Sequence, residues 1–180
     1  MRVVAGKYGG RPLKTLAGST TRPTTDKVKG AIFNMIGPYF DGGQVLDLYA
    51  GSGSLAIEAI SRGMDQAVLV EKDRRAQAIV QANIEMTKET TRFRLMKMEA
   101  KRALAQLTQA FDLVLLDPPY AKETIVETIL DLEQGGLLAP GALIVCETDK
   151  EVELPDSIGA SRKWKEKIYG ISKVTIYDID

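Results

Sequence analysis

The chain has 180 residues, of which 24 are Lys or Arg, 24 are Asp or Glu and none is His. This length, with 44% hydrophobic residues, is enough for one globular domain with a full core. The lack of histidine excludes Ser-His-Asp triads, Cys-His nucleophiles and histidine-based zinc sites, and the single cysteine, Cys146, excludes internal disulfides and cysteine clusters. Chemistry must therefore come from carboxylates, hydroxyls, Lys, Arg, backbone groups or a cofactor, and we expect no metal.

No apolar run approaches the roughly 20 residues that span a bilayer. The first residues contain no apolar stretch typical of a signal peptide. We therefore expect a cytoplasmic protein without a membrane partner, in a reducing compartment.

Residues 1–24 are predicted to form a basic arm. Two extended stretches flank Tyr8-Gly9-Gly10-Arg11, and Gly-Gly suits a hairpin turn because both positions can adopt a positive φ. Residues 1–30 hold seven basic residues against a single acidic one, Asp26. Such an arm is expected to meet a large anion such as a phosphate backbone. A solvated, flexible tail is the alternative interpretation.

The elements after the arm follow a regular order. A helix is expected over about 26–37, with Thr24 or Thr25 as its N-cap, and from residue 44 short apolar runs alternate with helical stretches. The strands and helices expected next are 45–48, 54–62, 67–70, 74–87, 93–96, 100–108, 111–116, 124–134 and 142–145, in that order. Asp73 is expected to cap the helix that follows it. The strands 163–169 and 172–178 should form a hairpin that turns at Gly170.

This alternation predicts an α/β fold with a mostly parallel sheet and helices on both faces. The final hairpin makes the last strand antiparallel and brings the total to seven strands. We expect residues 1–24 to be a β-hairpin extension and residues 25–180 to be the main domain, acting as a monomer.

The first loop at the carboxyl end of the sheet is rich in glycine. Ligands bind open α/β sheets at this end. Asp47 closes the first strand, and residues 51–56 (GSGSLA) fit the dinucleotide pattern G-x-G-x-x-A, in which glycines let the backbone approach a ligand. An acidic Asp47 disfavours a pyrophosphate but suits a ligand with an ammonium group. A glycine turn that only packs is the alternative.

Acidic residues also follow the next two strands. Glu71 stands 24 positions beyond Asp47, roughly where an acidic residue accepts hydrogen bonds from ribose hydroxyls. Its alternative role is that of a charge at a helix N-terminus. Met98-Glu99-Ala100 follow the third strand, where an adenine ring would lie, and Glu99 is either an acceptor for the exocyclic amine or a helix-capping charge.

Asp117-Pro118-Pro119-Tyr120 is the most informative tetrapeptide. Two prolines after a buried strand hold the backbone extended, which fixes the Pro118 carbonyl beside the Asp117 carboxylate. Together these acceptors match both hydrogens of an exocyclic amino group, and Tyr120 offers a flat face for a base. A rigid turn with an exposed tyrosine is the alternative.

Together these motifs resemble the Rossmann-like class I S-adenosylmethionine-dependent methyltransferases. Residues 2–13, 21–28 and 31–35 further resemble the RsmD family, bacterial 16S ribosomal RNA guanine(966)-N2 methyltransferases, over the whole chain. Two departures are visible: this chain has Lys29-Gly30 where the family usually has Arg-Glu, which argues against a charge pair there, and Met98-Glu99-Ala100 in place of Gly-Asp-Ala.

The resemblance implies S-adenosylmethionine as cofactor and 16S ribosomal RNA, alone or in an assembling small subunit, as partner. The candidate catalytic residues are Asp117, Pro118, Pro119 and Tyr120. The candidate cofactor-binding residues are Asp47, Tyr49, Gly51, Ser52, Gly53, Glu71, Lys72, Met98, Glu99, Ala100 and Asp117. The candidate RNA contacts are Lys7, Arg11, Arg22 and Lys27, with Arg162, Lys163 and Lys165 extending the basic track.

Three alternatives remain open at the level of the sequence. A dinucleotide-dependent oxidoreductase would use the glycine loop and Glu71, but it needs a substrate domain and would not favour Asp47. A DNA adenine-N6 methyltransferase would use the 117–120 motif, usually with a target-recognition region that this chain lacks. A non-catalytic RNA-binding module is the third, and the intact motif argues against it.

Overall fold

The computed structural model describes residues 1–16, 25–119 and 121–180. The helices are α1 (Asp26–Ile36), α2 (Ser54–Ser61), α3 (Arg74–Met86), a 3-10 turn at Thr90–Arg92, α4 (Ala100–Gln106) and α5 (Ala121–Gln134). The strands are β1 (Gln44–Asp47), β2 (Gln66–Val70), β3 (Phe93–Met96), β4 (Phe111–Leu116), β5 (Leu138–Asp149), β6 (Ser157–Ile158), β7 (Ser161–Tyr169) and β8 (Ser172–Asp178). No helix in these ranges is long and apolar enough to cross a membrane.

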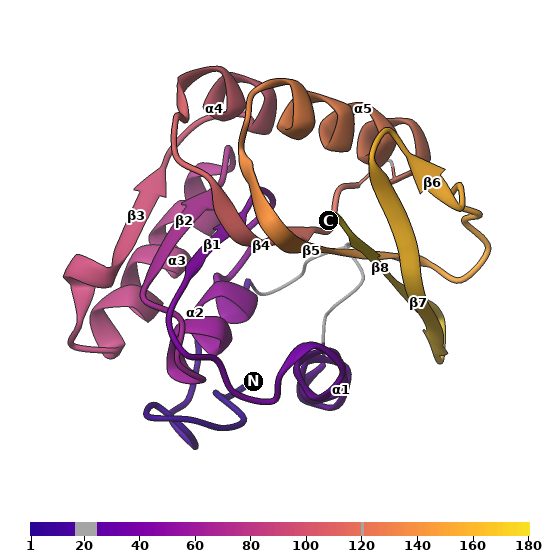
Figure 1. Cartoon of the computed structure of the whole chain (residues 1–180). Helices are drawn as coiled ribbons and strands as arrows, with labels where there is room; N and C mark the ends of the chain where they lie inside the picture. The colour runs from indigo at the N-terminus through magenta and orange to yellow at the C-terminus, as the bar shows by residue number, and fades with distance from the viewer. Residues whose placement is uncertain (17–24, 120) are drawn as a thin grey trace.

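One sheet forms the centre of the molecule, in the order β3-β2-β1-β4-β5-β8-β7-β6 (Figure 1). The first five of these strands are parallel, and β8 is antiparallel to β5, as the sequence predicts. Helices α4 and α5 cover one face, and α1, α2 and α3 cover the other (Figure 1). Each face has its own apolar core because alternate residues of a strand point to opposite faces.

Two helix starts confirm the predicted caps. Thr25 Oγ1 accepts the Val28 N–H at 3.2 Å, and Asp73 Oδ1 accepts the Arg75 N–H at 2.8 Å. Each side chain satisfies a backbone donor that has no partner within its helix.

The sheet has eight strands rather than the predicted seven, because the two-residue β6 pairs with the start of β7. A strand this short carries no readable pattern. Strand β5 extends beyond the predicted 142–145 at both ends. At its start, the pairing with β4 is irregular around Pro140 and Gly141. At its end, the strand continues into polar residues. Those polar residues are held by pairing with β8, a long-range contact that local hydropathy does not report.

The N-terminal residues fold back on themselves with an antiparallel bridge from Arg2 to Pro12, and backbone hydrogen bonds join the two limbs, including Val3 N–H to the Arg11 carbonyl at 3.0 Å. Their backbone is also bonded to a helix: the N–H groups of Val4 and Ala5 donate to the Glu58 carboxylate of α2 at 2.9 and 3.0 Å. Three side chains from this segment are buried in the core: Val3, Tyr8 and Leu13. Residues 1–13 are therefore not a solvated tail.

Candidate active site at the carboxyl ends of the strands

Three carboxylates meet at the carboxyl edge of the central strands. Asp47, the last residue of β1, is paired in register with Leu69 of β2 on one side and Leu115 of β4 on the other. Glu71 and Asp117 each lie two residues beyond those partners. Since a strand rises about 3.3 Å per residue, both acids project beyond Asp47 on either side of it. The structure thus brings together the acids that the sequence placed after three separate strands.

The glycine loop between β1 and α2 is tied to both neighbouring strands. The Leu48 N–H donates to the Leu115 carbonyl at 3.3 Å, and the Ala50 N–H donates to the Val70 carbonyl at 3.0 Å. Gly51 and Gly53 have φ of 60° and 82°, values that favour glycine. A Cβ on Gly53 would lie 3.2 Å from Leu69 Cδ2, whereas one on Gly51 would meet nothing within 4 Å. Gly53 is needed for packing, and Gly51 faces open space.

Glu71 is part of the same loop through hydrogen bonds. Its Oε1 accepts the Gly51 N–H at 2.8 Å, and its Oε2 accepts the Asp73 N–H at 2.9 Å. A carboxylate has about four acceptor positions, so two such bonds leave room for a ligand hydroxyl. The neighbouring Lys72 is exposed. Glu71 therefore holds the loop and faces the same edge as Asp47.

Asp47 is buried, with 3% of its surface exposed. Burial raises the pKa of its carboxyl to about 7, with the Glu71 charge adding to the effect, while backbone hydrogen bonds at Tyr49 and Ala56 oppose it. No Lys or Arg in the described ranges pairs with it. A buried acid of this kind is stabilised in its charged form by a ligand cation.

The end of β4 leads directly into the proline motif. Asp117 is half-buried, Pro118 is buried and Pro119 is exposed. Helix α5 begins at Ala121, three residues earlier than predicted. Tyr120 lies outside the described residues, so its stacking role stays a prediction.

The segment after β3 is more open. Met98 and Ala100 are half-buried, and Glu99 is exposed at the N-cap position of α4. The Glu99 side chain makes no capping hydrogen bond, so a helix cap does not account for it. The Tyr49 side chain lies elsewhere, between α4 and α5 beside Thr128, where burial raises the pKa of its hydroxyl. Only its backbone is near the glycine loop.

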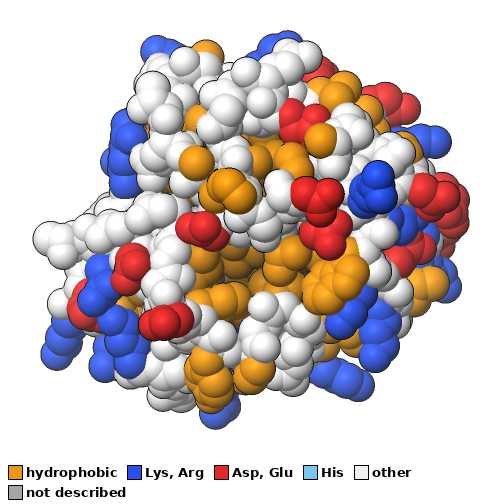
Figure 2. Space-filling view, in the orientation of Figure 1, with side chains coloured by type: hydrophobic (Ala, Val, Ile, Leu, Met, Phe, Trp, Pro, Cys, Tyr) orange, Lys and Arg blue, Asp and Glu red, His pale blue; other side chains and the backbone are white. Residues whose placement is uncertain are grey.

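The molecule is hollowed on the face shown in Figure 2. The hollow has hydrophobic walls with acidic side chains around it, and it lies between the central strands and helices α1 and α2 of Figure 1. Within the described ranges, no group of three or more Cys, Asp or Glu side chains is arranged to hold a metal ion.

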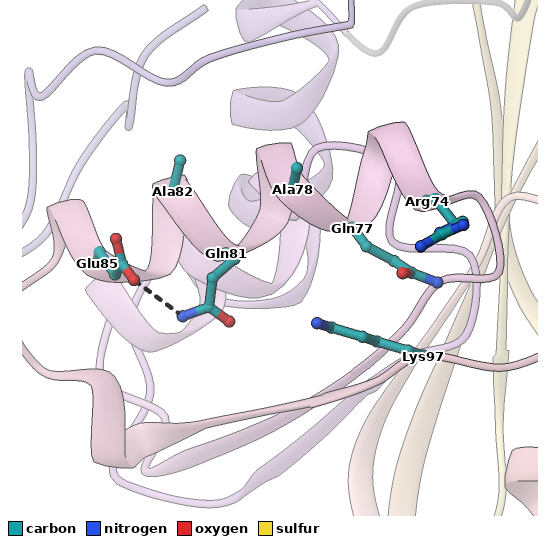
Figure 3. Close-up of a pocket in the computed structure, with 7 residues that line it drawn as sticks. All are labelled: Arg74, Gln77, Ala78, Gln81, Ala82, Glu85 and Lys97. Atoms are coloured by element: carbon teal, nitrogen blue, oxygen red, sulfur yellow. Dashed lines mark hydrogen bonds between the residues drawn. The ribbon is translucent and has the colours of Figure 1, made fainter.

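A separate groove of about 550 Å³ runs along the outer side of α3 (Figure 3). Arg74, Gln77 and Gln81 from the helix point toward Lys97, which directly precedes Met98. Gln77 Nε2 donates to the Glu71 carbonyl at 2.9 Å, so the groove borders the candidate site from outside the sheet edge.

Two basic residues of the arm, Lys7 and Arg11, contact other parts of the protein. Lys7 Nζ lies 2.7 Å from Glu89 Oε1, and Arg11 Nη1 donates to the Thr87 carbonyl at 3.3 Å. Both contacts lie past the end of α3, at the amino edge of the sheet, away from Asp117. Lys27 is exposed on α1, and Arg22 lies outside the described residues. A role for these four residues in RNA binding stays a prediction.

Two buried polar residues escaped the sequence analysis. Asn83 of α3 donates to the Ser52 carbonyl at 2.8 Å and to the Lys14 carbonyl at 3.0 Å, and its Oδ1 accepts the Lys14 N–H at 2.9 Å. It therefore ties the glycine loop to the N-terminal segment. The residue type does not reveal that Asn83 points inward. Its position on the apolar side of the helix is the one feature of the sequence that indicates it.

Glu58 of α2 is the second. Its Oε1 lies 3.5 Å from Lys29 Nζ and its Oε2 accepts from Arg62 Nε at 2.7 Å, with all three side chains buried. Lys29 Nζ also donates to the Arg2 carbonyl at 2.7 Å, and burial lowers the pKa of its ammonium. The departure at Lys29-Gly30 weakens the case for a charge pair there, yet Lys29 has one, because its partner comes from another helix.

Comparison with known proteins places the whole chain in one family. Residues 1–178 match the family model described as "Conserved hypothetical protein 95". The chain is 43% identical over 180 residues to "Putative rRNA methyltransferase YlbH" of Bacillus subtilis (strain 168), with 98% of both proteins covered. It is 34% identical over 177 residues to "Ribosomal RNA small subunit methyltransferase D" of Escherichia coli (strain K12), with 98% of this chain and 89% of that protein covered.

Solved structures agree with this fold. The structure described as "Putative methyltransferase yhhF from Escherichia coli" superposes with a TM-score of 0.88 at 32% identity, covering 100% of this chain and 98% of that one. The similarity therefore covers nearly the whole length of the chain, both in sequence and in structure. The chain belongs to the RsmD family, the family of "Conserved hypothetical protein 95", and has the class I methyltransferase fold.

Proposed function

We propose that this protein transfers a methyl group from S-adenosylmethionine to the exocyclic N2 amine of a guanine, at position 966 of the RNA, in 16S ribosomal RNA. The observation that carries the proposal is the convergence of Asp47, Glu71 and Asp117 around an open glycine loop at one sheet edge. The proposal that the substrate is ribosomal RNA rests on the relatives, whose names give that substrate. The proposal that the methyl group goes to N2 of guanine 966 rests on the resemblance of the motifs to the RsmD family.

The residues at the loop fit S-adenosylmethionine. The buried Asp47 carboxyl, without a cationic partner in the described ranges, suits the ammonium of the methionine part. Gly51 faces open space where a ligand can approach its backbone, and Glu71 is held beside it to accept from ribose hydroxyls. The bound cofactor would supply a methyl group that its sulfonium already makes electrophilic.

The chain's own task is to prepare the nucleophile. The lone pair of a guanine amino group is delocalised into the ring, so the nitrogen must become pyramidal before it can attack. Asp117 and the Pro118 carbonyl would accept its two N–H groups and stabilise the positive charge that develops on it. The amine becomes acidic as it gains the methyl, so no strong base is required beforehand, and the proton that it then loses would pass to Asp117 or to water. This fits a chain without histidine.

The direct test uses ribosomal RNA from cells that lack this protein. The purified protein is incubated with that RNA, naked or in small subunits, and with S-adenosylmethionine carrying a tritiated methyl group. Nucleoside mass spectrometry should then find N2-methylguanosine at one position. Methyl transfer to adenine N6, or to DNA in preference to RNA, would refute the proposal.

A further inference from the structure

The β7–β8 hairpin carries an exposed surface of aromatic and basic side chains. We define the hairpin face as the exposed Trp164, Lys165 and Lys167 together with Tyr169, which is half-buried and packs against the core. Trp164 is 44% exposed, although tryptophan is usually largely buried. In Figure 2, hydrophobic and basic side chains lie side by side over the lower part of this hairpin. The hydrophobic exposure continues around the tip with Ile168 and Ile171, at 56% and 66%.

The register of β7 puts these four residues on one side of the sheet. Lys165 and Lys167 lie opposite Ile176 and Val174, two residues of the core under α1, α2 and α3. The pairing is irregular between Lys163 and Lys165, as in a bulge that inserts one residue, here Trp164. Lys165 Nζ lies 4.2 Å from the centre of the Trp164 ring, so both side chains share this face.

A second lysine, Lys167, also lies beside an aromatic ring on this face. Lys167 Nζ lies 5.6 Å from the centre of the Tyr169 ring. No carboxylate in the described ranges pairs with Lys165 or Lys167. The acidic residue between them, Glu166, is paired on the opposite side of the strand with Lys163 at 2.9 Å and with Lys173 at 3.7 Å. Lys163 is therefore paired with an acid, while Lys165 and Lys167 of the hairpin face are not paired with a carboxylate in the described ranges.

The sheet register places this surface near the end of the sheet at which β4 leads into Asp117. β4 and β5 are paired in parallel up to Leu116 and Cys146, and Asp117 and Glu147 each follow that last pair by one residue. Glu147 is opposite Val174, and Val174 is opposite Lys167. The row of Lys167 thus lies one residue beyond the end of β4, where Asp117 follows, and β7 is three strand spacings from β4, or about 14 Å.

We propose that the hairpin face binds single-stranded RNA that flanks the target nucleotide. A base would stack on Trp164, and Lys165 and Lys167 would contact the adjacent phosphates. Stacking on an exposed aromatic ring beside basic side chains is the usual way in which proteins hold unpaired nucleotides. This inference rests on the proposed function, because it assumes that the substrate is RNA, and it assigns a contact on the side of the catalytic edge away from the N-terminal segment.

Trp164 is the only tryptophan in the sequence, so tryptophan fluorescence reports this one position. The full chain would be titrated with a single-stranded RNA of about ten nucleotides, within the range of site sizes of such surfaces. Saturable quenching is expected with RNA. Inorganic polyphosphate, which has phosphates but no bases, should leave the emission nearly unchanged. Binding of a fluorescein-labelled RNA, seen by anisotropy, without any change in tryptophan emission would overturn the inference.

Variants separate stacking from charge. Trp164→Ala should raise KM for RNA at least fivefold, with kcat and the KM for S-adenosylmethionine changed less than twofold. Lys165→Gln with Lys167→Gln should reduce the slope of log affinity against log salt by about 1.4, since each contact to single-stranded phosphate contributes about 0.7.

The matched controls lie at the amino edge of the sheet. Tyr39→Ala removes an aromatic side chain that is 63% exposed, and Lys88→Gln removes an exposed charge. Both should leave RNA affinity unchanged. Equal losses in the controls, or an unchanged KM in Trp164→Ala while the wild type methylates RNA, would overturn the inference and leave the proposed function standing. A wild type that binds RNA with quenching but transfers no methyl would support this surface and refute the proposed function.

Discussion

The Gly51 N–H donates a 2.8 Å hydrogen bond to Glu71 Oε1, which joins the glycine loop after β1 to the end of β2. One side chain thus fixes the conformation of the loop and presents its remaining lone pairs at the same edge. This double role makes Glu71 the most direct test of the cofactor site.

Replacing Glu71 by alanine should weaken S-adenosylmethionine binding at least tenfold, or about 1.4 kcal/mol, because both the loop contact and the ribose acceptor are lost. Isothermal titration calorimetry measures this directly. Glu85→Ala is the control and should bind normally, since Glu85 is an exposed acid of α3 whose carboxylate accepts from Gln81. Equal affinity for both variants would remove Glu71 from the cofactor site.

Asp117→Ala should lower turnover at least 100-fold while S-adenosylmethionine affinity stays within about twofold. The expected loss corresponds to an electrostatic group worth about 3 kcal/mol in the transition state. Tritium transfer to RNA measures turnover, and Asp156→Ala, which alters a fully exposed carboxylate, serves as the control. Normal turnover by Asp117→Ala would show that this carboxylate takes no part in the reaction.

The pKa of Asp47 is raised to about 7 in the folded chain from an ordinary 3.8, and this shift determines how stability changes with pH. Between these values the folded protein binds more protons than the unfolded chain, so this carboxyl makes stability fall as pH rises from about 4 to 7. Asp47→Asn should therefore raise the Tm at pH 8 by about 4 °C or more, and change it much less at pH 4. Differential scanning calorimetry at both pH values checks this.

The same group predicts how cofactor affinity depends on pH. A ligand ammonium is attracted to the ionised Asp47, so affinity for S-adenosylmethionine should rise from pH 6 to pH 8, and this rise should be absent in Asp47→Asn. An identical pH profile in the variant would show that the ammonium binds elsewhere.

Glu58→Gln should destabilise the protein by about 3–5 kcal/mol, because it leaves the buried charges of Lys29 and Arg62 without their partner. Urea unfolding gives the value, and the exposed Glu127→Gln should change it by less than about 0.5 kcal/mol. Adding Lys29→Met to Glu58→Gln should recover part of the loss. A double variant less stable than Glu58→Gln alone would contradict this explanation.

Asn83→Ala should lower S-adenosylmethionine affinity several-fold, because it frees the Ser52 carbonyl in the glycine loop and removes the partner of the Lys14 backbone N–H and carbonyl. Gln81→Ala, on the exposed side of α3, is the matched control. If the affinity of Asn83→Ala were normal and only its stability fell, Asn83 would serve packing alone.

The sequence alone determined the elements that local patterns encode. The apolar runs at Phe93–Met96 and Phe111–Leu116 are strands within those bounds, Thr25 and Asp73 cap their helices as predicted, and the parallel sheet follows from the alternation. The position of Asp47, Glu71 and Asp117 at one edge could also be predicted, because each follows or ends a parallel strand and parallel strands end on the same side of the sheet.

Tertiary structure decided what depends on partners far away in the chain. Strand β6 exists only because β7 pairs with it, β5 extends through polar residues because β8 pairs with it, and Lys29 is buried because Glu58 of another helix faces it. Lys163 and Lys165 look alike in the sequence, yet one is paired with Glu166 and the other lies over the Trp164 ring. Hydropathy and turn signals act over a few residues, whereas burial of a charge and the pairing of strands depend on segments that only the folded chain brings together.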